Sequence, residues 1–398
     1  MEKTGLTPPD FQRVADLPKL PVLTKDIVRT QTDALRARNI PVSRLRPART
    51  GGTTGQPITV WRRIEDSLWS RQCYARGLAW GGLKPAMPRL KLFGGSLGLP
   101  ASSLRSLGER LMRPRTVFLP AFELNRTNVC EYVATARASG AKHLIGYSSA
   151  LYLMALLAED AGERCQFESV YPTAELLLPE WGEQIRRVFR CKVLPYYGCG
   201  EVNSLAFSCG HDQGYHVCDE HAVIEIETSH NTFAFEGEGA FLVTDLDNYA
   251  MPFLRYRNGD AGILTGERCG CGRELSRILQ LHGRVNDYLL SARGDPVPGA
   301  IAPHLFRLVG GVRFYQFVQN APGQVIVRIV ATDDYQRDAE EAKIRQVLKT
   351  HLGADASIVF EYRDDVERTP AGKARFVISN CSRDAGREDA GDAYPRRG

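Results

Sequence analysis

The sequence lacks the long apolar runs that a membrane span requires. No stretch of about 18 uncharged apolar residues occurs anywhere in the 398 residues. The amino terminus, MEKTGLTPPDFQ, has neither a basic start followed by an apolar stretch nor a small-residue cleavage site. We therefore expect no membrane segment and no secretory signal, and we expect a cytoplasmic location.

An excess of charge of one sign is missing as well. The chain has 51 Lys and Arg residues against 46 Asp and Glu residues, a formal net charge of +5, and the acids are interspersed. A nucleic-acid-binding surface usually concentrates basic residues on one face. The composition therefore argues against a nucleic-acid partner, whereas a small anionic substrate is compatible with it.

Cysteine is not scarce, since the chain has ten. In a cytoplasmic protein these should be reduced thiols, metal ligands or redox groups rather than a disulfide framework. Cys73, Cys130, Cys165 and Cys191 stand singly among helical or strand patterns, and we interpret them as small core residues.

The length and the 43% hydrophobic content predict two or three domains with a sizeable core. Helical and strand patterns alternate after the amino-terminal segment, which predicts right-handed crossovers and a mainly parallel sheet. Glycine-punctuated strands follow and predict a small β-rich layer, and a β-β-α-β pattern comes last. The predicted fold class is α/β. We expect a large amino-terminal domain over 1–286, which begins with an extended lead-in arm over 1–45 in which Thr24 caps a short helix. A small mobile α+β domain over 287–380 and a disordered tail over 381–398 should follow.

The stretch RTGGTTGQPITV, residues 49–60, has the composition of a phosphate-binding loop. Glycines let backbone N–H groups point together at an anion, and threonine hydroxyls add donors without fixed charge. A Walker loop would continue with Gly-Lys-Ser or Gly-Lys-Thr, but Gln56 follows the last glycine here. Alone, the stretch also fits an ordinary tight turn. Its candidate binding residues are Thr50, Gly51, Gly52, Thr53, Thr54 and Gly55.

Three further stretches carry side chains suited to a nucleotide. In LPYYGCGEVNS, we expect a strand to end at Tyr197 and Gly198, where ligands gather in open α/β sheets, and Glu201 to hold Mg²⁺. Asp260, in an expected Gly-Asp turn, has the length to accept two ribose hydroxyls, and Arg284 has the reach to contact ribose or phosphate. Lys373 stands on a Pro-Ala-Gly turn of the last domain. Taken singly, each is also compatible with a routine turn or a solvated side chain.

The order and spacing of these stretches resemble those of the acyl-adenylate-forming ligases, and most closely the phenylacetate-CoA ligase branch with its capsule-biosynthesis relatives. The resemblance runs from DLPKLPVLTK to GKARFVIS, nearly the whole chain. It implies that the TGGTTG loop holds pyrophosphate and that Asp260 and Arg284 bind ribose. It also implies that Ala174 and Glu175 in VYPTAELL lie along adenine, together with Tyr197 and Gly198. It also implies that Asp287 is a hinge and that Lys373, Glu201 and Thr53 are catalytic.

The same resemblance implies an activity. ATP would convert a carboxylic acid to acyl-AMP with release of pyrophosphate, and CoA would be the acceptor of the acyl group. The first alternative is transfer of the acyl or AMP group to an amine, hydroxyl or cofactor acceptor. The second alternative is a non-catalytic, zinc-stabilised scaffold of the same fold. Tyr147, Ser148, Ser149 and Tyr197 are candidate pocket residues for an aryl or other compact acid. Gln56, where the family usually has Lys, and a short amino-terminal region depart from the pattern. A homodimer is compatible with this reading.

Cysteines and histidines cluster in FSCGHDQGYHVCDEH and ERCGCGREL. A Cys-x-Cys pair with a further Cys and a His can close a tetrahedral zinc site, although the spacing matches no common zinc finger. A similar pattern occurs in related ligases, which favours a structural rather than a catalytic Zn²⁺. The expected ligands are Cys209, His216, Cys269 and Cys271, with His211 and Cys218 as substitutes; reduced thiols beside a hydrogen-bonded histidine are the alternative.

Overall fold

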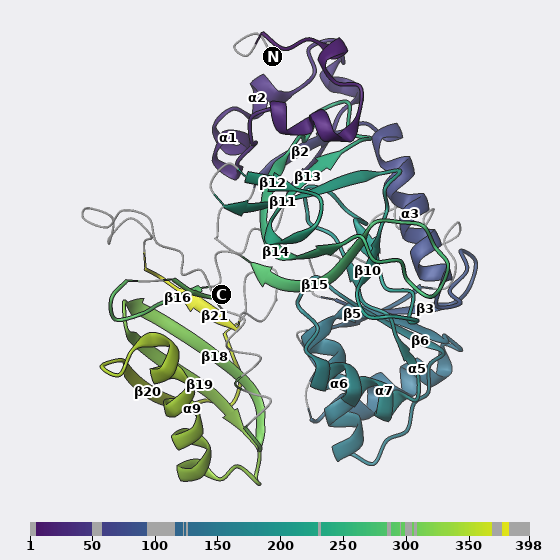
Figure 1. Ribbon diagram of the computed structural model, residues 1–398. Coiled ribbons are helices and arrows are strands. Elements are labelled where there is room, and N and C mark those ends of the chain that lie inside the picture. Colours follow the sequence, from purple (N-terminus) through teal and green to yellow (C-terminus); the bar gives the residue numbers. More distant parts are fainter. Residues whose placement is uncertain are drawn as a thin grey trace. The chain divides into compact units, whose positions relative to one another are not determined.

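The chain folds into two compact units that divide between His282 and Gly283 (Figure 1). The computed structural model describes residues 5–49, 58–93, 116–121, 123–124, 126–229, 232–284, 288–294, 296–298, 305, 309–367 and 376–381. The hinge predicted at Asp287 and the tail predicted beyond Cys381 lie outside these residues, so the division at 286 and 287 stays a prediction.

A five-stranded parallel sheet forms one layer of the first unit. Its strand order is β4-β3-β5-β6-β7, and every pair is parallel. Alternate residues of β5 face opposite sides: Leu144 packs in the core beneath the helices α5, α6 and α7, whereas Ile145 packs with Leu78 at the end of α3. The bounds are α3 (Leu68–Ala79), β3 (Arg89–Phe93), β4 (Thr116–Pro120), α5 (Val129–Ala138), β5 (His143–Tyr147), α6 (Ser148–Asp160), β6 (Ser169–Thr173), α7 (Pro179–Phe189) and β7 (Lys192–Val193).

An eight-stranded sheet forms the other layer, in the order β12-β11-β13-β14-β15-β10-β9-β8. It is larger than the small β-rich layer that the sequence suggests. Its core is built from inward side chains such as Ile226, Phe241 and Val243, all fully buried. The bounds are β8 (Tyr196–Tyr197), β9 (Ala206–Phe207), β10 (Tyr215–Val217), β11 (Ala222–Ser229), β12 (Thr232–Ala234), β13 (Gly237–Asp245), β14 (Tyr256–Thr265) and β15 (Arg277–Arg284).

The strand β8 belongs to this second sheet, which corrects one expectation. Tyr196 and Tyr197 pair antiparallel with β9 instead of ending a strand of the parallel sheet. The short apolar run before them is split by Pro195, and only β7 on its amino-terminal side pairs with β6. Proline has no N–H to extend a ladder, so the chain changes sheets there.

The amino-terminal arm contains short helices rather than one extended segment. Thr24 caps α1 as predicted, since its hydroxyl accepts the N–H of Ile27 at 3.3 Å. The backbone of Leu23 bonds to the strand β14, with its N–H 3.1 Å from the carbonyl of Arg255. The bounds are η1 (Pro8–Asp10), η2 (Val14–Lys19), α1 (Lys25–Thr30), α2 (Thr32–Leu35), η3 (Val42–Arg44), β1 (Arg46–Arg49), β2 (Thr59–Arg62) and η4 (Glu65–Ser67).

The second unit has the expected β-β-α-β arrangement. Its main sheet has the order β20-β19-β18-β21, and the helix α9 buries Ile344, Leu348 and Leu352, spaced one turn apart. The α/β fold class with a small α+β carboxy-terminal unit is therefore confirmed. Within the described residues, no helix is long and apolar enough to cross a membrane. The bounds are β16 (Tyr288–Leu290), β17 (Pro296–Pro298), β18 (Val312–Ala321), β19 (Gln324–Ala331), α9 (Arg337–Leu352), β20 (Ser357–Tyr362) and β21 (Val377–Ser379).

Candidate active site and metal centre

The turn after β6 is fastened to the start of α6. The carboxylate of Glu175 accepts the N–H of Ser149 at 2.9 Å, and the carbonyl of Glu175 accepts the hydroxyl of Ser148 at 3.0 Å. A carboxylate at a helix amino terminus satisfies free N–H groups and complements the helix dipole. Ala174, just before it, is exposed and has φ of 67°, a conformation that costs energy for a residue with a Cβ. The segment predicted to line adenine is thus held rigidly at the carboxyl end of the parallel sheet.

Tyr197 and Asp260 meet, although 63 positions separate them. The Tyr197 hydroxyl lies 2.7 Å from Oδ2 of Asp260 and also accepts Nδ2 of Asn258 at 2.7 Å. Burial, together with the Asp260 charge, raises the pKa of Tyr197 well above its usual value, so the hydroxyl stays protonated and donates to Asp260. The backbone N–H of Asp260 donates to Oδ1 of Asn258 at 2.9 Å. This network fixes the carboxylate before any ligand arrives.

Asp260 stands within β14 and not in a turn, contrary to the sequence-based expectation. Ala240 pairs with Ala261 while Leu242 pairs with Arg257, so the strand bulges between these partners. Gly259 lies in this bulge with φ of 87°. A Gly-Asp pair suits a bulge and a turn equally because both require a positive φ, and the sequence alone does not separate them.

Glu201 is buried in the connection between β8 and β9. Its carboxylate accepts the Tyr256 hydroxyl at 3.2 Å, and its carbonyl accepts a hydrogen bond from the Arg62 guanidinium. The backbone turns tightly around it, since the N–H of Cys199 donates to the carbonyl of Val202 at 3.0 Å.

Gly198 permits a close approach of two backbone segments. A Cβ at this position would lie 2.8 Å from the backbone nitrogen of Ser204, closer than real Cβ contacts. Any other residue would push apart the two ends of the segment that carries Glu201. The glycine of the Tyr-Gly-x-x-Glu stretch is therefore required by packing, whatever else it contributes.

The connection that carries Glu201 is anchored by a histidine that the sequence analysis missed. His221 lies 2.7 Å from the carbonyl of Asn203 through Nε2, and its Nδ1 hydrogen-bonds to Asp247. Asp247 is fixed in turn, because its N–H donates to Oδ1 of Asp245 at 3.0 Å. This contact could be found only after β11 and β13 are aligned, because their register pairs Asp245 with the residue that follows His221.

The cysteine and histidine cluster assembles from segments far apart in the sequence. Cys209, His216, Cys269 and Cys271 offer ligand atoms that all lie within 4.8 Å of one another. The Sγ atoms of Cys209 and Cys269 are 3.6 Å apart, and Sγ of Cys271 is 3.3 Å from Nε2 of His216. In a tetrahedral zinc site with Zn–S of about 2.3 Å, neighbouring sulfurs are about 3.8 Å apart. The separations are those of a tetrahedral site.

The two thiols of the Cys-x-Cys pair differ in protonation, since burial raises the pKa of Cys269 to about 12. Burial alone would raise the pKa of Cys271, but hydrogen bonds from the backbone and side chain of Arg273 lower it to about 7. Burial lowers the pKa of His216, which keeps the imidazole neutral. Its Nδ1 is buried without a hydrogen-bond partner among the described residues. The substitutes named from the sequence group elsewhere: His211 with Asp212 and Cys269, and Cys218 with Cys73 and Glu220.

Other predicted site residues stand as follows. Tyr147, Ser148 and Ser149 are almost fully buried where β5 passes into α6. Arg284 is the last residue of β15, and its side chain is outside the described part. Thr50, Gly51, Gly52, Thr53, Thr54, Gly55, Asp287 and Lys373 also lie outside the described residues, so their roles stay predictions.

Comparisons with known proteins agree on one set of relatives. A family model described as the CapK C-terminal domain matches residues 289–380. The chain is 25% identical over 378 residues to Protein CapK of Staphylococcus aureus, covering 92% of this chain and 81% of that protein. It is also 25% identical over 413 residues to the phenylacetate-coenzyme A ligase of Thermus thermophilus, covering 95% and 90%.

Solved structures show the same fold. A 2-hydroxyisobutyryl-CoA ligase in the postadenylation state with its acyl-AMP gives a TM-score of 0.75 at 18% identity, covering 95% of this chain and 84% of that one. An amide bond synthetase from Marinactinospora thermotolerans gives a TM-score of 0.56 at 18% identity, covering 85% and 70%. Sequence relatives and fold agree with the motifs: the chain is similar to CapK and to the phenylacetate-CoA ligases over nearly its whole length, which supports the acyl-adenylate-forming ligase superfamily.

Proposed function

We propose that this protein activates a carboxylic acid with ATP, forming acyl-AMP and pyrophosphate, and then transfers the acyl group to CoA. The observation that carries the proposal is that two residues of β14 fix the motif around Glu201: Asp260 bonds to the Tyr197 hydroxyl at 2.7 Å, and the Tyr256 hydroxyl bonds to Glu201 at 3.2 Å. An adenylating enzyme mainly positions its substrates and neutralises charge. The carboxylates of Asp260 and Glu201, held in position beside aromatic hydroxyls before a ligand binds, suit the binding of a nucleoside.

Each residue then has a task. Asp260 accepts the ribose hydroxyls, and the Ala174–Glu175 turn borders the base. The Thr53–Gly55 loop holds the departing pyrophosphate while the acid attacks the α-phosphorus in line. Lys373 neutralises the carboxylate and α-phosphate oxygens in this step, and rotation about Asp287 withdraws it for the second. These roles follow from the family motifs.

Glu201 is the residue that would hold Mg²⁺. Its carboxylate is buried and bonded to a neutral hydroxyl, and among the described residues no cationic side chain pairs with it. A buried carboxylate of this kind fits a hard cation, which when bound supplies positive charge to the phosphate oxygens. Tyr256 keeps the carboxylate oriented.

A structural Zn²⁺ is proposed for the group Cys209, His216, Cys269 and Cys271. The support is the 3.6 Å and 3.3 Å separations and the lowered pKa of Cys271. Four protein ligands leave no open position, so the ion would be structural.

The acceptor has a second candidate. The amide bond synthetase among the structural neighbours supports an amine in place of the CoA thiol, on the same acyl-AMP chemistry. The buried Tyr147, Ser148 and Ser149 support an aryl or other compact acid rather than a long acyl chain.

The test is magnesium-dependent exchange of pyrophosphate into ATP over a panel of aryl, heteroaryl and short aliphatic acids. We expect exchange with one class of acid, and its collapse in the Glu201→Ala and Lys373→Ala variants. Cys130 is exposed and not the core residue that the sequence suggested, so Cys130→Ala is the matched control and should exchange normally. Product analysis with CoA or with amines then identifies the acceptor. Folded, metal-replete protein that exchanges with no acid would reject the proposal in favour of a scaffold role.

A further inference from the structure

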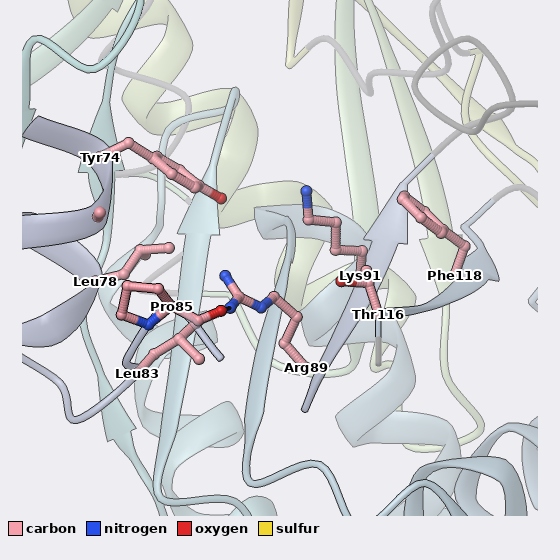
Figure 2. Close-up of a pocket in the computed structure, with 9 residues that line it drawn as sticks. Tyr74, Leu78, Leu83, Pro85, Arg89, Lys91, Thr116 and Phe118 are labelled. Atoms are coloured by element: carbon pink, nitrogen blue, oxygen red, sulfur yellow. Dashed lines mark hydrogen bonds between the residues drawn. The ribbon is translucent and has the colours of Figure 1, made fainter. Parts of the chain in front are cut away.

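A cavity of about 270 Å³ lies between α3 and the strands β3 and β4, all within the first unit (Figure 2). Its volume is close to the lower end of the range for small-molecule sites, about 300 Å³. The residues that matter here are Tyr74, Leu78, Leu83, Arg89, Lys91 and Phe118. None of them belongs to the candidate nucleotide site.

Two cations enter this cavity from one strand. Arg89 and Lys91 alternate along β3 with Leu90 and Leu92, which are fully buried on the opposite face. Figure 2 shows the Arg89 guanidinium and the Lys91 ammonium bordering the space that the Tyr74 ring also borders. Like charges side by side repel each other, and no acid is among the described residues that line the cavity.

The Arg89 guanidinium is held in place without a carboxylate. It donates to backbone carbonyls, from Nε to Met87 at 3.4 Å and from Nη2 to Lys84 at 3.3 Å. Among the described residues, it forms no ion pair with an acid. Carbonyls position a guanidinium but do not neutralise it, so a partly buried positive charge persists there.

Apart from Thr116 and the Tyr74 hydroxyl, the rest of the described lining is apolar. Leu78 and Leu83 are almost fully buried beside the guanidinium, and the Lys91 ammonium lies 5.7 Å from the centre of the Phe118 ring. Solvated surface cations do not need such walls. An apolar cavity with a few fixed polar groups is the usual form of a small-molecule site.

We propose that this cavity binds a small organic oxyanion, a carboxylate or phosphate carried on a compact apolar body. Arg89 and Lys91 bind the oxyanion through charge-assisted hydrogen bonds, and Leu78, Leu83 and Phe118 contact the apolar part. The site is separate from Tyr197, Glu201 and Asp260, and its existence does not depend on the proposed adenylation.

The first experiment measures binding without ATP. 4-(Trifluoromethyl)benzoate is titrated into the full chain and followed by ¹⁹F NMR, with neutral 4-(trifluoromethyl)benzamide as the matched probe. We expect the benzoate to bind and the benzamide to bind at least about tenfold more weakly, because only the anion gains both charged contacts. Phenyl phosphate in the same titration distinguishes a phosphate from a carboxylate preference.

Variants then locate the bound anion. Arg89→Met and Lys91→Met should each weaken benzoate binding about tenfold or more, whereas Lys84→Met, which removes an exposed cation outside the lining, should leave it unchanged. Unchanged binding in both cavity variants, or equal binding of the benzamide, overturns the proposal, as does a complete lack of benzoate binding.

Photolabelling of the unmodified protein guards against a variant that fails to fold. Irradiation with 4-azidobenzoate should label peptides within 74–91 or 116–118, and excess 4-(trifluoromethyl)benzoate should suppress this labelling. Label found only in other segments overturns the proposal, even where adenylation with the same acids is observed.

Discussion

Arg255 lies fully buried where the amino-terminal arm meets the antiparallel sheet. Its guanidinium is 3.1 Å from the carboxylate of Glu225, donates to the carbonyls of Pro18 and Leu20, and stacks 4.0 Å from the centre of the Phe233 ring. Burial raises the pKa of Glu225, while the Arg255 guanidinium opposes this shift. One side chain therefore neutralises a buried acid and also fastens the arm.

The substitution Arg255→Met should lower the free energy of unfolding by about 3–5 kcal/mol, because it leaves a buried carboxylate without its partner. The strand offers a matched control: Arg257 pairs with Glu227 at 2.7 Å but is 40% exposed. Arg257→Met should therefore cost less than about 1 kcal/mol. Urea denaturation measures both values, and equal costs would contradict the argument from burial.

His143 is fully buried at the start of β5, with neither ring nitrogen hydrogen-bonded among the described residues. Burial lowers its pKa from the usual 6.5; Glu168, 3.8 Å away, opposes the shift, whereas Arg89 and Lys142 add to it. The unfolded chain thus binds a proton that the folded chain resists. The contribution of His143 to the free energy of unfolding is therefore fully present above the pKa that this histidine has in the unfolded chain. It is lost as the pH falls below that value.

The variant His143→Leu should therefore flatten the loss of stability between about pH 7.5 and pH 5.5. Urea denaturation at intervals across this range measures the difference in slope. His351→Asn, which changes an exposed histidine of α9, is the control and should keep the wild-type slope. Parallel curves for the wild type and His143→Leu would show that this histidine does not contribute.

At the scale of elements, the connection between β8 and β9 is held by the residue that precedes β11, a strand of the same sheet. His221, just before β11, holds the carbonyl of Asn203 at 2.7 Å, two residues after Glu201. The described hydrogen bonds of the His221 ring go to Asn203 and Asp247. His221 is a positioning residue, and its removal should act through Glu201.

If the proposed adenylation holds, His221→Phe should lower pyrophosphate exchange about 10–100-fold, as removal of such supporting partners commonly does. The magnesium concentration for half-maximal exchange should rise, while the KM for the acid changes little. His221→Gln, which retains hydrogen-bonding groups, should restore part of the activity. A loss of activity with unchanged magnesium dependence would indicate a general loss of structure instead.

The sequence predicts those elements whose signal is local. Thr24 caps α1, and α9 lies in the expected β-β-α-β unit, because capping and helical periodicity depend on neighbours in the chain. It does not assign β8 to its sheet or Asp260 to a bulge, because pairing partners lie far away in the sequence. His221 was missed for the same reason. The four proposed zinc ligands were chosen correctly as neighbours, since a Cys-x-Cys pair limits the geometry strongly, although the metal itself stays a proposal.

At the scale of the whole molecule, the proposed zinc site joins segments that no helix connects. Cys209 follows β9, His216 lies in β10, and Cys269 and Cys271 stand between β14 and β15. A metal that binds only the folded chain stabilises it by its binding free energy. All four proposed ligands belong to the first unit, and none lies in 283–381.

Protein purified without chelator should contain about one equivalent of zinc, and its removal should destabilise the first unit selectively. We expect Cys271→Ser, or prolonged chelation, to lower the first unit's Tm by roughly 5 °C or more, since 1 kcal/mol shifts Tm by about 2–4 °C in domains of 150–250 residues. Hydrogen exchange of the full chain should quicken in 206–217 and 265–278, while 312–331 keeps its protection. Cys381→Ser, in the second unit, is the control. Less than about half an equivalent of zinc would contradict a structural metal, because a site closed by four protein ligands should be filled. Equally fast exchange in both units would also contradict it, because loss of the metal should act first on the strands that the site joins.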